Sequence, residues 1–267
     1  MANVMGVENA PEFSDWVEQV RNLNTAYTLE TGKTKKFKLD VFGCQMNERD
    51  SETIAGMLTD MGFEEVSKND FADMIVFVTC CVRENAEERI YGHIGALSGE
   101  CAKNGSFIVA CGCMMQQPHV VEKIRKSYHN VKIVFGTHNI HTFPALLHRY
   151  LTKGKRVFEV WEKEDKIIEE LPIKRTEKHK AWVNIIYGCN NFCSYCIVPH
   201  VRGRERSRSI TDILAEIKAL AADGCKEITL LGQNVNSYGN DLGEKDLFAK
   251  LLYAIEDIDG IKRVRFM

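Results

Sequence analysis

The sequence predicts an α/β protein made of two successive runs in which strands alternate with helices. Short apolar runs typical of buried parallel strands are followed by longer segments whose apolar residues recur every three or four positions. This alternation stops between residues 154 and 180, where Lys and Glu are dense, and then resumes. A chain of 267 residues is long enough for about two domains that each bury a core.

Residues 36–153 form the first run, a predicted amino-terminal domain of four strands that are each followed by a helix. The strands are KFKLDVFGC, DMIVFVTC, FIVACGC and VKIVFG. The first two helices place on one face Ile54, Met57, Leu58 and Met61, and Ala86, Ile90, Ile94 and Leu97, respectively. The other two helices cover PHVVEKIRKSY and PALLHRYL. Repetition of this unit predicts a parallel sheet with right-handed crossovers.

The segments on either side of this domain lack a sustained period. Residues 1–35 are expected to be a leader that contains only a short amphipathic piece around Phe13 to Val20. Residues 154–180, which include KRTEKHK, show neither a helical nor a strand period and are predicted to be a linker.

Residues 181–267 form the second run. AWVNIIYG, EITLLG and IKRVRFM are its predicted strands, with helices from about Ser209 to Ala222 and over FAKLLYAIED. Three parallel strands make the first half of a β/α barrel, and the third would leave an open edge of unpaired backbone groups. We therefore expect a partial barrel domain in a C-terminally shortened chain.

Composition excludes several classes of protein. With 45% hydrophobic residues, 27% charged residues and a net charge of −2, the chain is globular and has no overall attraction to nucleic acid, so RNA binding would depend on local patches. The start MANVMGVENAPEFSDWVEQ has acids where a signal peptide is basic, and no apolar run reaches membrane-spanning length. We expect a cytoplasmic protein without a membrane partner, whose ten cysteines are thiols, metal ligands or catalytic groups.

Three cysteines lie within eight residues directly after a predicted strand. Cys189, Cys193 and Cys196 form the C-x-x-x-C-x-x-C pattern of YGCNNFCSYC. Their spacing suits one 4Fe–4S cluster, and because a cubane has four irons, one iron would stay open to an outside ligand. A zinc site with three ligands and three coincidental thiols are the alternatives. With Tyr195 between the last two cysteines, the pattern resembles the signature of the radical S-adenosylmethionine superfamily.

Three further cysteines lie at the carboxyl ends of three consecutive predicted strands. Cys44, Cys80 and Cys113 are each separated by one strand and one crossover helix. Carboxyl ends of parallel strands meet at one rim of a sheet, so the fold would bring these thiols together. Core packing is the alternative for each cysteine taken singly. It is the interpretation that we keep for Cys81, Cys101, Cys111 and Cys225.

These runs together resemble the radical S-adenosylmethionine methylthiotransferases. LDVFGCQMN, VTCCVRENAEERIYG, ACGCMMQQ and VFGTHNIH are similar to the amino-terminal domain of that family, and YGCNNFCSYCIVPHVRGRERSRS with LLGQNVNSYG is similar to its radical domain. The resemblance covers about Lys36 to the chain end and is strongest to the tRNA 2-methylthio-N(6)-dimethylallyladenosine synthases. Val78 stands where the family often has Asn, and the family's RNA-binding TRAM domain has no counterpart in this sequence.

The resemblance implies two 4Fe–4S clusters and S-adenosyl-L-methionine as cofactors. It assigns Cys44, Cys80 and Cys113 to an auxiliary cluster and Cys189, Cys193 and Cys196 to the radical cluster, with the choice between Cys80 and its neighbour Cys81 resting on alignment. It also implies a tRNA substrate, an electron donor such as flavodoxin or ferredoxin, and a sulfur source. The implied reaction adds a methylthio group to carbon 2 of an adenosine next to the anticodon, by way of a 5′-deoxyadenosyl radical.

Other candidate residues follow from position. Tyr195, Gln233 and Asn234 are candidates for cofactor binding, the last two because they follow a strand at the rim of the barrel. Contacts to RNA or to a cofactor anion are assigned to the alternating residues Arg202, Arg204, Arg206 and Arg208, for which a solvated charge run is the alternative.

Several other functions stay open. A threonylcarbamoyladenosine-tRNA methylthiotransferase or a ribosomal-protein methylthiotransferase would show the same six cysteines. A two-cluster electron carrier and an RNA-binding scaffold are the alternatives without catalysis.

Overall fold

The first part of the chain folds around one parallel sheet. The computed structural model describes residues 12–81, 84–163 and 166–267. Its largest sheet has six strands in the order β2-β1-β3-β4-β5-β6, and every neighbouring pair is parallel. The bounds are β1 Lys36–Val41, β2 Glu64–Glu65, β3 Met74–Thr79, β4 Phe107–Gly112, β5 Val131–Phe135 and β6 Val157–Glu159. The four predicted strands are thus present, with two short strands added at the edges of the sheet.

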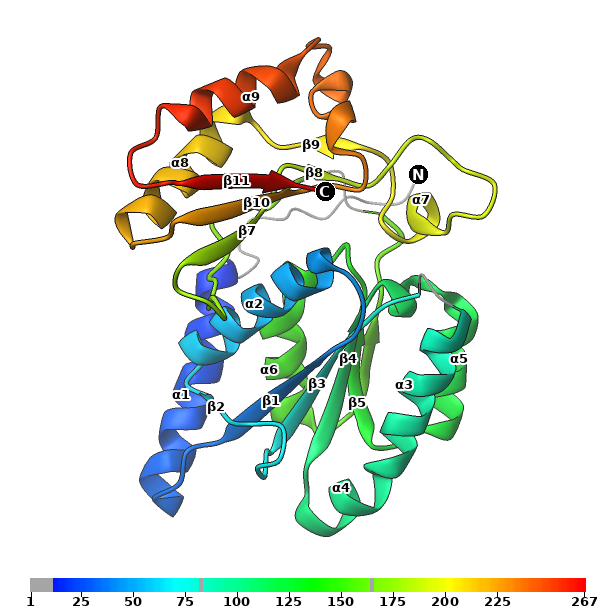
Figure 1. The fold of residues 1–267 in the computed structure, drawn as a ribbon. Helices are drawn as coiled ribbons and strands as arrows, with labels where there is room; N and C mark the ends of the chain where they lie inside the picture. The colour runs from blue at the N-terminus through cyan, green and yellow to red at the C-terminus, as the bar shows by residue number, and fades with distance from the viewer. Residues whose placement is uncertain (1–11, 82–83, 164–165) are drawn as a thin grey trace, which may run out of the picture.

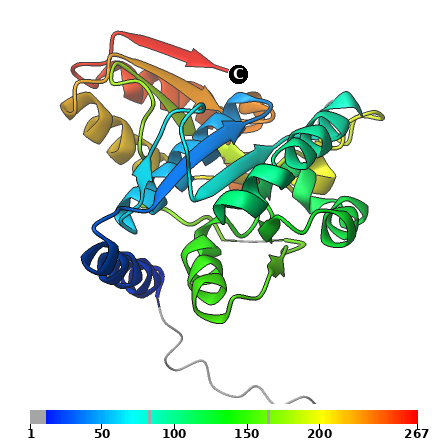
Figure 2. The ribbon, with the colours of Figure 1, turned by 90° about the horizontal axis from the view of Figure 1, so that it is seen from below.

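Helices cover both faces of this sheet (Figures 1 and 2). Their bounds are α2 Gln45–Asp60, α3 Glu84–Ala96, α4 Ser98–Asn104, α5 Pro118–Ser127 and α6 Phe143–Lys153. Alternate residues of β3 serve the two faces: Val76 belongs to the core shared with α2 and α6, whereas Ile75 and Phe77 belong to the core that contains Ile90 of α3. Burial on both faces explains why the strands read as continuous apolar runs.

The segment 1–35, expected to be a leader, contains a longer helix than the short amphipathic piece that the sequence pattern indicated. Phe13–Thr31 forms a helix, α1, which packs against α6 and α2 and ends at Gly32. Its buried side chains are Val17, Val20 and Asn24, and the Asn24 amide donates to the Met61 carbonyl over 2.8 Å. A buried stripe of only three residues, one of them polar, gives a weak hydrophobic period, which is why the sequence pattern showed only a short piece.

The second part contains a smaller parallel sheet in the order β11-β10-β7. Its bounds are β7 Lys180–Asn184, β10 Glu227–Leu231 and β11 Arg263–Phe266, with α8 Ile210–Ala222 and α9 Leu247–Glu256 packed on one side. This is the predicted first part of a β/α barrel. The predicted strand AWVNIIYG is divided, because after Asn184 the chain forms β8 Ile186–Tyr187, which pairs antiparallel with β9 Arg206–Ser207.

The segment predicted as a linker contains one strand. Val157–Glu159 is β6 and pairs with β5, a contact too short to leave a period-two pattern in the sequence. Residues 160–163 and 166–179 form no helix or strand. This stretch is held against α2: the backbone N–H of Lys174 donates to the Glu52 carbonyl over 2.9 Å, and that of Thr176 donates to the Glu52 carboxylate over 3.0 Å.

The two sheets are stacked so that the smaller one lies above the carboxyl ends of the larger one (Figure 1). A short helix, α7 Val198–Val201, reaches down to the same rim. Among the described residues, no helix is long and apolar enough to cross a membrane.

Candidate metal centres and the interface between them

The three cysteines that follow the strands of the large sheet lie at one rim. Cys44 is the N-cap residue of α2 just beyond β1, Cys80 directly follows β3, and Cys113 opens the 3-10 helix Cys113–Gln116 after β4. Because β1, β3 and β4 are neighbours in the sheet, the fold gathers residues that are far apart in sequence. Cys80 and Cys113 are buried and Cys44 is half-buried.

Gly43 allows the chain just before Cys44 to pass close to the side chain of Cys80. Its φ is +122°, and a Cβ added there would lie 2.4 Å from Cys80 Cβ and 2.7 Å from Cys80 Sγ. Only glycine gives the turn between β1 and α2 both this conformation and this space. A larger residue at position 43 would therefore displace Cys80 or change the turn that leads to Cys44.

Asn47 connects the strand ends beneath these cysteines. It is fully buried, and its amide nitrogen donates to the carbonyls of Phe42 and Thr79 over 2.6 and 3.0 Å. Its amide oxygen accepts a hydrogen bond from Arg202 over 2.8 Å. Sequence reasoning did not single out Asn47, although it stands three residues after Cys44 on the first turn of α2, where side chains at this spacing share a face.

Two neighbours polarise the thiol of Cys113. A hydrogen bond from Cys81 and the positive charge of Arg202 lower the pKa of the Cys113 thiol, against the effect of burial, and the same hydrogen bond raises the pKa of the Cys81 thiol. The thiolate is the form that binds iron. The contact places Cys81 as well as Cys80 at this rim, so the choice between these two as ligand stays a prediction.

The other three cysteines occupy a loop beyond β8. Gly188, at φ +72°, lets this loop pass against the chain near residue 204: a Cβ there would lie 2.1 Å from the Arg204 carbonyl oxygen. The Cys189 N–H donates to the Gly203 carbonyl over 3.1 Å, and the Cys196 N–H donates to the Cys193 carbonyl over 2.9 Å. Cys189 is buried, Cys196 is half-buried and Cys193 is exposed, so exposure increases from the first cysteine of the loop to the second.

Each cysteine trio supplies thiols for three of the four irons of a 4Fe–4S cluster. Among residues 12–81, 84–163 and 166–267, no three or more His, Cys, Asp or Glu side chains are grouped so as to hold a metal ion. A tetrahedral zinc ion needs its sulfurs around one point at about 2.3 Å, whereas a four-iron cluster takes each cysteine on a separate iron. The absence of a site for a single ion thus does not exclude a cluster, and the binding of clusters by these six cysteines stays a prediction.

The four arginines after the loop have different environments. Arg202 is buried and pairs with Asp50 over 2.9 Å, and Arg208 is buried and pairs with Glu216 over 2.7 Å. Arg204 is exposed, with its guanidinium 4.2 Å from the centre of the Phe192 ring. Arg206 is half-buried and lies over Tyr187. Arg202 and Arg208 thus direct their hydrogen bonds to protein groups.

Two family models match separate parts of the chain. Residues 36–136 match the Uncharacterized protein family UPF0004, and residues 183–266 match the Radical SAM superfamily. We call the part folded around the large sheet, which contains the first match, the UPF0004 domain, and the part folded around the small sheet, which contains the second match, the Radical SAM domain. The rim cysteines Cys44, Cys80 and Cys113 lie in the first match, and Cys189, Cys193 and Cys196 lie in the second.

Three curated relatives that match most of the chain share a name. The chain is 50% identical over 252 residues to a tRNA-2-methylthio-N(6)-dimethylallyladenosine synthase of Acetivibrio thermocellus, covering 94% of this chain and 52% of the relative. It is 54% identical to the synthase of Clostridium tetani, covering 91% and 54%. It is 51% identical to that of Alkaliphilus oremlandii, covering 99% and 55%. The chain thus spans about half the length of these curated relatives.

A solved structure shares the fold. The radical S-adenosylmethionine methyltransferase TsrM from Kitasatospora setae, with its tryptophan substrate and a SAM analog bound, superposes with a TM-score of 0.51 at 14% identity. The match covers 85% of this chain and 53% of that chain. At this identity the likeness concerns the fold alone.

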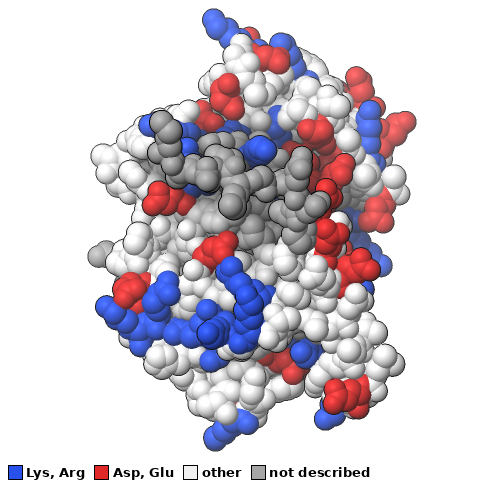
Figure 3. All heavy atoms as spheres, turned by 180° about the vertical axis from the view of Figure 1, so that it is seen from behind, with Lys and Arg blue, Asp and Glu red and all other residues white. Residues whose placement is uncertain are grey.

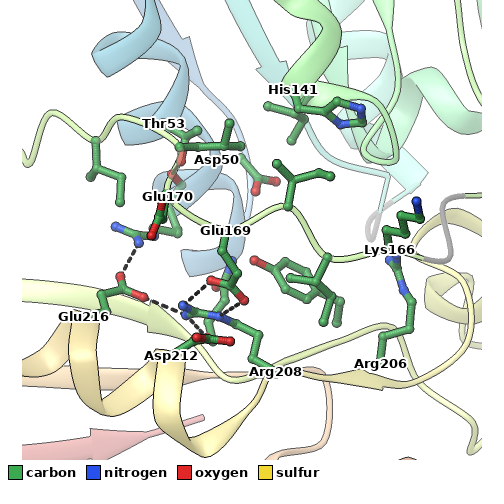
Figure 4. Close-up of a pocket in the computed structure, with 18 of the residues that line it drawn as sticks. Asp50, Thr53, His141, Lys166, Glu169, Glu170, Arg206, Arg208, Asp212 and Glu216 are labelled. Carbon is green, nitrogen blue, oxygen red and sulfur yellow. Dashed lines mark hydrogen bonds and ion pairs between the residues drawn. The ribbon is translucent and has the colours of Figure 1, made fainter. Parts of the chain in front are cut away.

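An ion-pair network joins the two domains (Figure 4). Glu216 on α8 of the Radical SAM domain pairs with Arg49 on α2 of the UPF0004 domain and with Arg208. Arg208 also pairs with Glu169 of the linker. This network borders a cavity of about 440 Å³ between the domains, which His138, His141 and Lys166 also line. None of the six predicted cysteine ligands lines this cavity.

The remaining predicted site residues lie apart from the network. Tyr195 is 93% exposed on the cysteine loop. Gln233 follows β10 and its side-chain amide contacts the Met46 sulfur of α2, while the Asn234 amide donates to the Ser237 hydroxyl over 2.6 Å. Gln233 therefore lies at the interface with the UPF0004 domain, next to the helix that starts at Cys44.

The UPF0004 domain carries a basic surface that sequence reasoning missed. Arg125 and Arg156 both lie with their guanidinium groups 4.6 Å from the centre of the Phe158 ring. Lys132 lies on β5, the strand that pairs with β6, where Ile133 is opposite Val157. Figure 3 shows Lys and Arg side chains gathered on the lower half of this face. We define the basic surface as Arg125, Lys132 and Arg156 together with their near neighbours along the chain, Lys126, Lys153 and Lys155.

Proposed function

We propose that this chain belongs to a methylthiotransferase that adds a methylthio group to carbon 2 of N(6)-dimethylallyladenosine next to the anticodon of tRNA. The observation that carries the proposal is an identity of 50–54% to tRNA-2-methylthio-N(6)-dimethylallyladenosine synthases over 91–99% of the chain. The union of a UPF0004 domain with a Radical SAM domain supports it. Because the chain spans about half of those relatives, the activity is proposed for the whole protein.

The cofactors proposed are two 4Fe–4S clusters and S-adenosyl-L-methionine. When bound, a reduced cluster of this kind supplies the electron that cleaves S-adenosylmethionine to a radical able to remove hydrogen from an aromatic carbon. No side-chain base removes such a hydrogen near neutral pH. Cys189, Cys193 and Cys196 would hold the radical cluster, and Cys44, Cys80 and Cys113 the auxiliary one. Each trio leaves one iron without a protein thiolate, which allows an outside ligand to bind.

The chain's own residues prepare these positions. Gly43 and Gly188 shape the turns that precede Cys44 and Cys189. Arg202 and Asn47 fix the rim beside Cys113. Tyr195, Gln233 and Asn234 remain the proposed contacts for the cofactor, and Arg204 and Arg206 remain the more accessible candidates for an anionic group.

The basic surface supports tRNA as the partner. Two of its six cations, Arg125 and Lys126, pair with the same carboxylate, that of Glu122, over 3.6 and 3.1 Å, so positive charge is locally in excess. A local excess of this kind attracts phosphates even though the whole chain carries −2. Location in the cytoplasm, an electron donor such as flavodoxin or ferredoxin, and a sulfur source complete the proposal.

The first experiment tests the clusters and the enzyme class. Anaerobically reconstituted protein should hold about eight irons, and Cys189→Ala, Cys193→Ala and Cys196→Ala combined should remove about half of them and abolish cleavage of S-adenosylmethionine. Cys101→Ala, in α4 away from both trios, is the matched control and should keep both. Iron near four in the unmutated protein contradicts two clusters, and absence of cleavage by the unmutated, reduced protein contradicts the enzyme assignment. Intact cleavage in the triple variant contradicts the assignment of the radical cluster to these three cysteines.

The second experiment identifies the substrate. Mass spectrometry of tRNA nucleosides from cells that lack the full-length protein should show N(6)-dimethylallyladenosine without its methylthio group. Loss of the group from threonylcarbamoyladenosine, or from a ribosomal protein, would instead assign the protein to one of the two related activities.

A further inference from the structure

Arg202 reaches from the Radical SAM domain into the cysteine rim of the UPF0004 domain. Its Nε donates to Cys113 Sγ over 3.1 Å, and its Nη2 donates to the Asn47 amide oxygen over 2.8 Å and to the Asp50 carboxylate over 2.9 Å. The side chain is 6% exposed. Because a guanidinium is planar, these bonds fix its orientation relative to the sulfur.

The backbone that carries Arg202 is also held against the UPF0004 domain. The Thr137 hydroxyl donates to the Val201 carbonyl over 2.8 Å, and the Arg202 N–H donates to the Val198 carbonyl over 2.8 Å within α7. A Cβ at Gly203 would lie 3.3 Å from the His138 ring, so the chain passes close to that side chain. Arg202 stands six residues after Cys196 and therefore links the two cysteine trios through a short, docked helix.

We propose that Arg202 is a positioning residue that holds the Cys113 sulfur and raises the reduction potential of the iron–sulfur cluster bound there. The inference rests on the proposed function, because it requires a cluster at this rim. A cation that donates a hydrogen bond to a ligand sulfur stabilises the more negative, reduced cluster. Asp50 offsets part of the charge of Arg202, but its carboxylate binds Nη2 whereas the sulfur accepts from Nε.

The test isolates the auxiliary cluster. In protein with Cys189→Ala, Cys193→Ala and Cys196→Ala, the remaining cluster is reduced with dithionite and its potential is measured by titration followed by electron paramagnetic resonance. Arg202→Met should lower the equilibrium constant for one-electron reduction by tenfold or more, equivalent to about 59 mV. Arg202→Lys, which keeps the charge but loses the planar donor, should give a smaller shift.

Arg49→Lys is the control, because Arg49 joins the same two domains but directs its guanidinium to the Glu216 carboxylate. It should leave the potential unchanged. If Arg202→Met loses its cluster while Arg49→Lys retains it, the role of Arg202 in holding the Cys113 sulfur is supported. The potential of Arg202→Lys then tests whether Arg202 also raises the reduction potential of the cluster. A parental potential in Arg202→Met with four irons bound overturns the inference and leaves the proposed function intact. Absence of a cluster from the Arg202-containing protein contradicts both.

Discussion

The carboxylate of Glu216 in α8 pairs with the guanidinium of Arg49 in α2, and this contact joins the Radical SAM domain to the UPF0004 domain. Glu216 also accepts from Arg208 over 2.7 Å. All three side chains are at least four-fifths buried. Glu216→Gln would leave two buried guanidinium groups short of a counter-charge, so we expect a loss of roughly 2–4 kcal/mol in the free energy of unfolding.

Urea denaturation measures this loss, with Glu244→Gln as the matched control. Glu244 pairs with Lys250 at 3.9 Å and both side chains are more than half exposed, so the control should change stability by about 0.5 kcal/mol or less. Equal effects of the two substitutions would show that the network contributes no more than a surface pair.

Gly43→Ala should destabilise the protein by more than the strain of its positive φ alone, and it should disturb the cysteine rim. The new Cβ would overlap Cys80, so we expect a loss of about 2 kcal/mol or more and reduced iron at the auxiliary site. Gly105→Ala is matched in its positive φ, +73°, but has open space around its Cβ, and should cost about 1 kcal/mol with normal iron content. Iron content equal in the two variants would contradict the role of Gly43.

Gly56→Ala should release the linker from α2. Replacing a helical glycine by alanine normally stabilises by up to about 1 kcal/mol, but here the Cβ would lie 2.5 Å from the Pro172 carbonyl oxygen. We expect faster proteolytic cleavage within residues 166–179. Gly92→Ala in α3, where nothing lies within 4 Å, should stabilise the protein and leave that cleavage rate unchanged. A slower cleavage in Gly56→Ala would show that the linker accommodates the methyl group.

Tyr238 should make stability depend on alkaline pH. Burial raises the pKa of Tyr238 from its ordinary value of about 10 to about 12, and its hydroxyl donates to the Arg208 carbonyl over 2.9 Å. Because the folded state favours the protonated phenol, this contribution is complete below pH 10 and is lost as pH rises toward 12. The difference in unfolding free energy between the parent and Tyr238→Phe should therefore be constant from pH 8 to 9.5 and shrink above pH 10. A difference in unfolding free energy that grows above pH 10 would contradict a raised pKa of Tyr238 in the folded state.

Lys153→Gln with Lys155→Gln should weaken RNA binding through the basic surface. Loss of phosphate contacts reduces affinity for all sequences alike and lowers the slope of log affinity against log salt by about 1 for each contact. Filter binding with a tRNA anticodon stem-loop measures both. Lys103→Gln with Lys245→Gln makes the same change in net charge at exposed sites outside this surface. Identical salt slopes in the two pairs would assign the RNA to another face.

The sequence by itself determined the order of strands and helices and the positions of the cysteines on it. Apolar runs such as DMIVFVTC record burial on both faces of a strand, which is a local consequence of a parallel sheet. Once the strands are placed, Cys44, Cys80 and Cys113 must follow β1, β3 and β4. The C-x-x-x-C-x-x-C loop is likewise readable, because its three thiols are close along the chain.

Only the tertiary structure decided which distant side chains meet. The spacing after Cys196 placed Arg202 in a run of alternating arginines, yet its partners Asn47, Asp50 and Cys113 lie 155, 152 and 89 positions away. The docking of α1, the added strand β6 and the pairing of Arg49 with Glu216 were equally absent from the sequence patterns. Periodicity reports that a face is buried, whereas the choice of partner depends on how whole domains pack, which the order of residues within one helix or strand does not encode.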